Sequence, residues 1–238
     1  GTLDDCIVAA GKDLTKLRNL KVTGQINARD FAVMKFRMER LSSLNLKETV
    51  IVAGDGGDLG QDEAYGPNMD DEIPVNAMSG KESLTSLVLP DKLRVISGGS
   101  GGHCGAFANC INLSGSLIIP EGVEEIGPAA FACCTSLTGR LQLPSTLKRI
   151  GSAKGYDPYW DGTFTECNFT CELIIPDSVE EIGMGAFRYC KNLYGELRLP
   201  DNLKNIGASA FEGCENLSGS LEIPQGVLSI PVNCFNGT

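Results

Sequence analysis

Five of the ten cysteines stand at a fixed place relative to a phenylalanine, three residues after it. Thiols could form disulfides, hold zinc or act as nucleophiles. Zinc requires clustered ligands such as paired C-x-x-C motifs, and the sequence has none, so we predict no metal site. Because the position recurs with each phenylalanine, we expect small buried hydrophobic groups rather than bridges. The five are Cys110, Cys134, Cys167, Cys190 and Cys214.

The other five cysteines, among them Cys6 and Cys234, do not share this position. A disulfide from Cys104 to Cys133 or Cys171 stays open as an alternative, because spacing alone does not fix a pairing.

His103, the only histidine, lies in the glycine-rich stretch SGGSGGHC. The sequence has neither G-x-S-x-G nor H-E-x-x-H, so a hydrolase triad or a zinc-protease site has no support. The glycines also lack the G-x-G-x-x-G and P-loop spacings that cradle phosphates. We therefore predict a loop here, no cofactor and no enzymatic activity.

Carboxylates crowd the stretch AGDGGDLGQDEAYGPNMDDE at residues 53–72. Oxygen ligands suit calcium, but the D-x-D-x-D-G spacing of a calcium loop is missing. We expect a solvated loop, with calcium binding as the alternative.

The stretch YDPYWD at residues 156–161 holds the only tryptophan, with two tyrosines and two carboxylates. Exposed rings with polar edges favour contacts with a protein and also stack on sugars. Alternatively, the rings fold back and stabilise their own loop. The candidate ligand-binding residues here are Tyr156, Asp157, Tyr159, Trp160 and Asp161.

A repeat explains where these residues stand. Apolar triplets begin at residues 20, 44, 87, 117, 141, 173, 197 and 221, so the intervals are 24, 43, 30, 24, 32, 24 and 24 residues. A period of this size indicates a solenoid, in which each coil buries its apolar side against its neighbours. The triplet alternates like a strand, and the following proline ends it. The spacing of Phe131, Cys134 and Leu137 follows a helical turn.

These features predict an α/β solenoid, a right-handed coil with short parallel strands on one face and short helical turns on the other. Residues 1–43 are expected to form an N-terminal helical cap with the first divergent coil, including helices near 2–11 and over 27–41. Residues 44–238 are expected to form the repeat solenoid. Its insertions near 53–72, 97–104 and 151–163 are expected to project from one side, as binding loops often do.

The middle residue of each triplet should point outward, onto a concave face. Apolar residues with charged flanks there suit a protein interface, although they could simply stabilise the sheet. The candidate residues on this face are Val88, Ile118, Gln142, Ile174, Arg198 and Glu222. In the first two triplets the same position holds Lys21 and Asn45.

The chain resembles the BspA-type leucine-rich repeat family, whose units read roughly A-F-x-x-C-x-x-L-x-x-L-x-L-P-x-x-V-x-x-I-G. The segments GAFANCINLSGSLIIPEGVEEIG (105–127) and SAFEGCENLSGSLEIPQGVLSIP (209–231) fit this pattern. Met78 replaces the phenylalanine and Lys81 the cysteine of one unit. The resemblance implies a surface-exposed or secreted bacterial protein that binds host or neighbouring-cell proteins.

Composition argues against further classes of protein. A net charge of -10 disfavours nucleic-acid binding. No apolar run reaches the roughly 20 residues of a membrane span, and no signal peptide is expected within this chain.

We expect a monomeric, non-enzymatic extracellular or cell-surface protein with an unidentified protein partner. One alternative is a structural spacer in a longer surface protein, because CFNGT ends in mid-unit, so that either the last coil is blunt or the protein continues. Another is a glycan-binding or glycan-active protein that uses Asp157 and Asp161.

Overall fold

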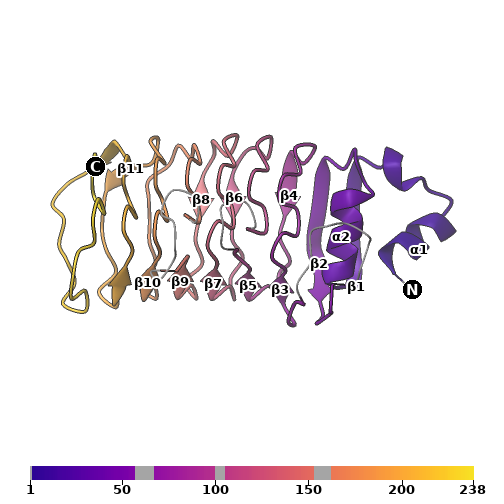
Figure 1. The fold of residues 1–238 in the computed structure, drawn as a ribbon, viewed down its shortest axis with the longest axis horizontal. Helices are drawn as coiled ribbons and strands as arrows, with labels where there is room; N and C mark the ends of the chain where they lie inside the picture. The colour runs from indigo at the N-terminus through magenta and orange to yellow at the C-terminus, as the bar shows by residue number, and fades with distance from the viewer. Residues whose placement is uncertain (1, 57–66, 100–104, 153–161) are drawn as a thin grey trace.

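The computed structural model describes residues 2–56, 67–99, 105–152 and 162–238. Its coils follow one another along the long axis, with the two termini at opposite ends (Figure 1). The predicted parallel-strand solenoid with a helical N-terminal cap is confirmed, because every strand pair in the ladders is parallel.

Two helices form the N-terminal cap. α1 (Leu3–Ala9) begins at a capping box of Thr2 and Asp5, and α2 (Ala28–Phe36) begins at Asn27, whose side chain accepts a bond from the Arg29 amide. The expected helix over 27–41 is too long, because the chain leaves the helix at Arg37 and turns before residue 41. A short 3-10 helix (Leu14–Lys16) joins this cap to the first strand.

The first coils pair through their triplets. β1 (Asn19–Ile26), β2 (Ser43–Ile51) and β4 (Ser86–Val88) form one sheet, and β6 (Leu117–Ile118) pairs with β8 (Leu141–Gln142). Inward and outward residues alternate as predicted.

A second set of strands runs along another side of the coils, labelled along one edge in Figure 1. It is a continuous sheet of six two-residue strands, and sequence analysis did not predict it. In chain order they are β3 (Glu72–Ile73), β5 (Val95–Ile96), β7 (Glu125–Ile126), β9 (Arg149–Ile150), β10 (Glu181–Ile182) and β12 (Asn205–Ile206).

The predicted helical turns on the phenylalanine side are wrong, because these segments are successive tight turns. Around Phe131, for example, the amides of Ala132 and Cys134 bond carbonyls three residues back. Ala129 and Cys133 have φ of 54° and 58°, a left-handed backbone that interrupts any helix.

A column of phenylalanine rings fills the interior of these turns. Neighbouring rings stack with centroids 5.1, 5.8, 5.5, 5.5 and 5.8 Å apart, so each coil buries its ring against the next. The column consists of Phe107, Phe131, Phe164, Phe187, Phe211 and Phe235.

The five repeated cysteines lie beside this column, fully buried. Each thiol donates a hydrogen bond to the backbone carbonyl of the phenylalanine position in the preceding coil, as Cys134 does to Phe107 at 3.2 Å. Cys190 does the same to Phe164 at 3.0 Å. The cysteine therefore packs and also satisfies a carbonyl between coils, which agrees with the expected packing role.

The triplet ladder breaks at Cys171. The coils with triplets at residues 117, 141, 197 and 221 have a glycine two residues before the triplet, and Gly195 and Gly219 have φ of 97° and 94° there. Cys171 stands in that place, and the Leu141 amide donates to its Sγ at 3.3 Å instead of to a carbonyl. From this coil onward the triplets carry no strand pairing. The pairing moves upstream to β11 (Tyr194–Glu196) and β13 (Asn216–Ser218).

The three insertions do not all occur at the same point of a coil. Those near 97–104 and 151–163 follow β5 and β9, so they leave the six-stranded sheet at the same edge. The insertion near 53–72 instead lies before β3, so the prediction of one shared side fails for it.

Candidate functional site

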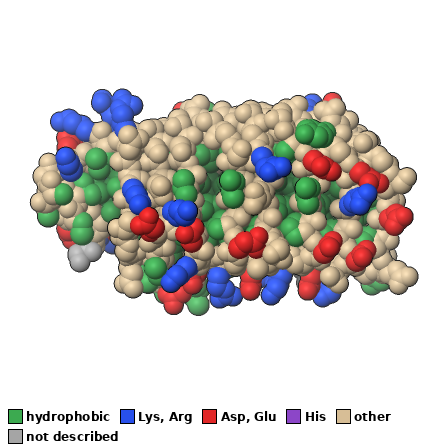
Figure 2. All heavy atoms as spheres, turned by 180° about the vertical axis from the view of Figure 1, so that it is seen from behind, with side chains coloured by type: hydrophobic (Ala, Val, Ile, Leu, Met, Phe, Trp, Pro, Cys, Tyr) green, Lys and Arg blue, Asp and Glu red, His purple; other side chains and the backbone are tan. Residues whose placement is uncertain are grey.

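The six triplet residues predicted to face outward are all exposed on one surface, which we call the triplet face. Their backbone alternates between core and solvent, as in Leu117, Ile118 and Ile119, which are buried, exposed and buried. Val88, Ile118 and Ile174 are 39%, 56% and 66% exposed. Figure 2 shows a face of the molecule on which hydrophobic side chains follow the long axis and acidic side chains gather toward the C-terminal end.

The other predicted cluster, Tyr156, Asp157, Tyr159, Trp160 and Asp161, lies outside the described residues, as do His103 and Cys104. Its binding role stays a prediction.

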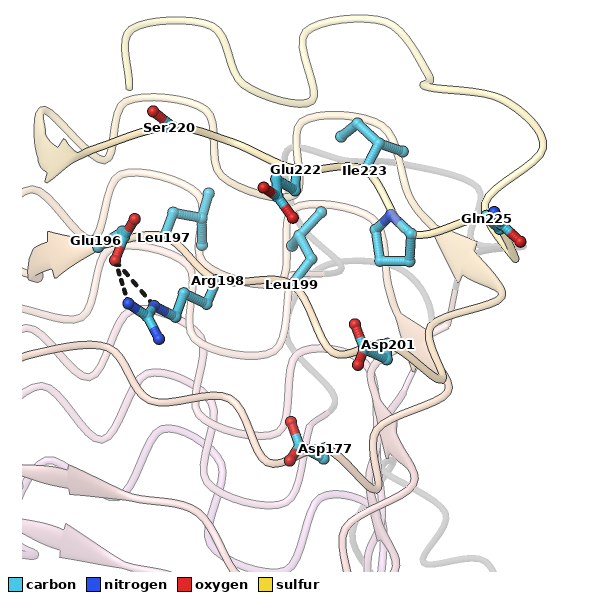
Figure 3. Close-up of a pocket in the computed structure, with 11 residues that line it drawn as sticks. Asp177, Glu196, Leu197, Arg198, Leu199, Asp201, Ser220, Glu222, Ile223 and Gln225 are labelled. Atoms are coloured by element: carbon cyan, nitrogen blue, oxygen red, sulfur yellow. Dashed lines mark hydrogen bonds and ion pairs between the residues drawn. The ribbon is translucent and has the colours of Figure 1, made fainter.

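A groove of about 600 Å³ opens near the C-terminal end of the triplet face (Figure 3). It brings together two of the predicted residues, Arg198 and Glu222. We call it the C-terminal groove, and it lies where the triplets of two successive coils are unpaired. Its lining comprises Asp177, Glu196, Leu197, Arg198, Leu199, Asp201, Ser220, Glu222, Ile223, Pro224 and Gln225.

Among the described residues that line this groove, the one cation is Arg198, and it is already paired. The Arg198 guanidinium donates to Glu196 Oε2 at 2.6 and 2.9 Å, and this contact raises the pKa of Arg198. The carboxylates of Asp177, Asp201 and Glu222 have no hydrogen-bond or ion-pair partner among the described residues. The groove therefore combines apolar walls with uncompensated negative charge.

A second depression, the central groove, opens at the Cys171 break with a volume of about 420 Å³. It contains the predicted residues Gln142 and Ile174. Sequence analysis missed Tyr194, which is 53% exposed at its rim. The signal that could have found this groove is Cys171 at a glycine position. The remaining lining residues are Arg140, Leu141, Leu143, Thr170, Cys171 and Glu172.

Several of the described thiols are unsuited to nucleophilic chemistry. Burial raises the pKa of the Cys110 and Cys214 thiols to about 12. Burial also raises the pKa of the half-buried Cys133 to about 11, with the nearby Glu166 acting in the same direction. Since the thiolate is the reactive form, these groups are inert near neutral pH.

The described carboxylates at the base of the 53–72 insertion bond their own backbone. Asp70 Oδ1 accepts from the Ala53 amide at 2.7 Å, and Glu72 Oε2 accepts from the Met69 amide at 2.7 Å. Among residues the structure describes, no group of three or more His, Cys, Asp or Glu side chains is arranged to hold a metal ion. In the same ranges, no helix has the length and apolar character that a membrane crossing requires.

A stack of apolar coils with repeating phenylalanine and cysteine ladders defines a leucine-rich repeat solenoid. The family model for the BspA type leucine rich repeat region matches residues 71–154 and 160–238, in six copies. The chain belongs to the BspA-type leucine-rich repeat family. No curated protein matches it significantly.

Solved structures of bacterial leucine-rich repeat proteins resemble the chain. The T. pallidum protein TpLRR is 30% identical over 62% of this chain and 71% of that protein, with a TM-score of 0.46. A leucine-rich repeat protein from Bacteroides ovatus is 21% identical, with a TM-score of 0.38. This match covers 89% of this chain and 62% of that protein. A leucine-rich cell surface protein from Faecalibacterium prausnitzii is 19% identical, covering 94% and 72% at 0.44.

Proposed function

We propose that the protein is a non-enzymatic binding protein of the bacterial surface or exterior, and that its triplet face contacts a protein of a host or neighbouring cell. The observation that carries this proposal is the row of exposed β-branched side chains. Ile118 and Ile174 lie at solvent-facing positions of the solenoid, Ile174 lines the central groove, and the C-terminal groove opens in the coils that follow.

An apolar centre with a polar rim is the usual anatomy of a protein interface. Here the apolar residues are Val88, Ile118 and Ile174, with Gln142 between the two isoleucines, and Arg198 lies on the rim. Large exposed aliphatic groups that no neighbouring coil covers increase the exposed apolar area, which a partner would bury.

The test is a capture experiment with partner proteins from host secretions and neighbouring bacterial surfaces. The face variant is Ile118→Asp/Ile174→Asp. The matched control is Val8→Asp/Met69→Asp, because Val8 and Met69 are 60% and 71% exposed near the N-terminal end and receive the same charge. Circular dichroism melting would verify that both variants fold.

We expect the face variant to lose at least about tenfold in affinity for a captured partner, because it places two charges in a desolvated contact. The control should bind as the unmodified protein does. Equal losses in both variants, or none in the face variant, would remove this surface from consideration.

A further inference from the structure

We infer that the C-terminal groove binds an extended, lysine- or arginine-containing segment of the protein partner. This inference rests on the proposed function, and it adds the chemistry of the partner. It comes from the shape of the groove, from the side chains that line it and from how charge is balanced elsewhere on the solenoid.

The shape of the groove suits an extended chain. Asp177, Arg198 and Glu222 come from three successive coils, so the groove crosses the coils rather than following one of them (Figure 3). Neighbouring coils lie about 4.8 Å apart, so three coils span about 10 Å, the length of three extended residues. Leu199 and Ile223 provide apolar walls for the aliphatic parts of such a segment.

Elsewhere on the solenoid, several carboxylates are paired with a cation of a neighbouring coil. Lys204 Nζ lies 2.6 Å from Glu180, and Lys191 Nζ lies 3.1 Å from Glu215. The pairs Arg94–Glu124 at 3.3 Å, Arg188–Glu212 at 2.9 Å and Arg149–Glu125 follow the same rule. This pattern of charge balance does not extend to Asp177, Asp201 and Glu222 in the C-terminal groove, although Glu196 there is paired with Arg198 of its own coil.

The residue after the triplet proline makes the contrast sharper. In the coil of Glu121, the next coil provides Ser145 at the equivalent position, and its hydroxyl donates to the carboxylate at 2.9 Å. In the coil of Asp177, the equivalent neighbour is Asp201, a second carboxylate. Like charges at equivalent positions of paired coils repel one another, so an incoming cation would relieve a cost already present in the fold.

A cationic segment would therefore be complementary in charge to the C-terminal groove. Its ammonium or guanidinium groups would meet Asp177, Asp201 and Glu222, and attraction between opposite charges would also speed association.

The test uses a fluorescein-labelled peptide GKVKVKG and its counterpart GEVEVEG, titrated by fluorescence anisotropy. The groove variant is Asp177→Asn/Asp201→Asn/Glu222→Gln. The control variant is Glu124→Gln/Glu180→Gln/Glu215→Gln, which changes the net charge equally but removes carboxylates that already have cationic partners.

We expect GKVKVKG to bind the unmodified protein, and its affinity to fall about tenfold or more in the groove variant and less than about twofold in the control. Binding should weaken between 50 and 300 mM NaCl. GEVEVEG should not bind. Asp201→Asn alone should leave the urea midpoint unchanged or higher, because it removes a repulsion rather than a support.

The inference is overturned if GKVKVKG does not bind, or if both triple variants weaken it equally. It is also overturned if calorimetry finds calcium in the groove, or if sedimentation finds self-association that the groove variant abolishes. A partner that requires Ile118 and Ile174 but ignores the groove variant would overturn this inference while leaving the proposed function intact.

Discussion

Lys81 occupies the position where the following coils have a buried cysteine. It is also buried, but its ammonium group reaches the C-terminal end of α2, where it donates to the carbonyls of Lys35 and, just beyond the helix, Met38 at 2.7 Å each. These carbonyls lie at the end of the helix, which lacks partners for its last carbonyls. One side chain therefore joins the N-terminal cap to the repeat stack.

This contact makes stability depend on pH. Burial lowers the pKa of Lys81 from its ordinary 10.5 to about 8, although Glu39 and Cys110 oppose the shift and Lys35 adds to it. Between these two values the unfolded chain binds more protons than the folded one. The contribution of Lys81 to the free energy of unfolding therefore increases as the pH rises from about 8 to 10.5.

Urea denaturation at pH 7, 8, 9 and 10 would check this prediction. The difference in unfolding free energy between the unmodified protein and Lys81→Met should grow toward pH 10. Lys12→Met, at an exposed lysine, should follow the unmodified protein throughout. Parallel curves for Lys81→Met and the unmodified protein would contradict the expected pKa.

For single residues, the sequence predicted well which side chains are exposed but poorly which groups they contact. The repeat register correctly predicted that the ladder cysteines are buried and that Ile118 and Ile174 are exposed, because inward and outward positions alternate in each triplet. The repeat register identified Lys81 as a departure from the consensus. It did not predict the contact of Lys81 with Met38, because a contact between residues 43 positions apart leaves no local sequence pattern.

The six-stranded sheet depends on glycines at the ends of its strands. A Cβ built at Gly207 would lie 2.3 Å from the Met184 amide nitrogen and 2.5 Å from the Gly183 carbonyl carbon. Both are backbone atoms of the preceding coil, so neither can rotate away. The glycines after the isoleucines of β7, β10 and β12, which are Gly127, Gly183 and Gly207, are needed because two backbones approach closely at those points.

We therefore predict that Gly207→Ala destabilises the protein by roughly 1–3 kcal/mol, as overpacking of a tight interior does. Asn205→Ala, at an exposed position of the same strand, should change stability by no more than about 0.5 kcal/mol. The free energy of unfolding in urea would measure both. An unchanged Gly207→Ala protein would mean that the coils can separate there without cost.

Elements were harder to predict than residues. The strands of the six-stranded sheet are two residues long, too short to show an alternating pattern, so they were not predicted. The helical turns were mispredicted because the spacing of Phe131, Cys134 and Leu137 fits a helix and a series of tight turns equally well. The grooves follow from lost ladder pairing, and Cys171 at a glycine position is the one local sign of it.

Both sets of strands hold neighbouring coils together, but only the six-stranded sheet is continuous. The triplet ladder breaks at Cys171, but the sheet from β3 to β12 continues across that break. Its bonds run from the Gly151 amide to the Ile126 carbonyl at 2.7 Å and from the Gly183 amide to the Ile150 carbonyl at 2.6 Å. The solenoid should therefore unfold as one stack rather than as two halves.

Hydrogen exchange would check this expectation. The amides of Gly151 and Gly183 should be protected to a similar degree. The amide of Leu143, at the break, has no backbone partner among the described residues and should exchange quickly, although its side chain is half-buried. A loss of protection at Gly183 together with Leu143 would mean that the break propagates through the whole coil.

The termini lie at opposite ends of the long axis, and each coil holds mainly its immediate neighbours. A chain anchored at one end and pulled at the other would therefore lengthen in steps as coils peel away in turn. Releasing 24 residues adds roughly 80 Å of contour length. An arrangement of this kind is extensible under load and regains its shape once the force is removed.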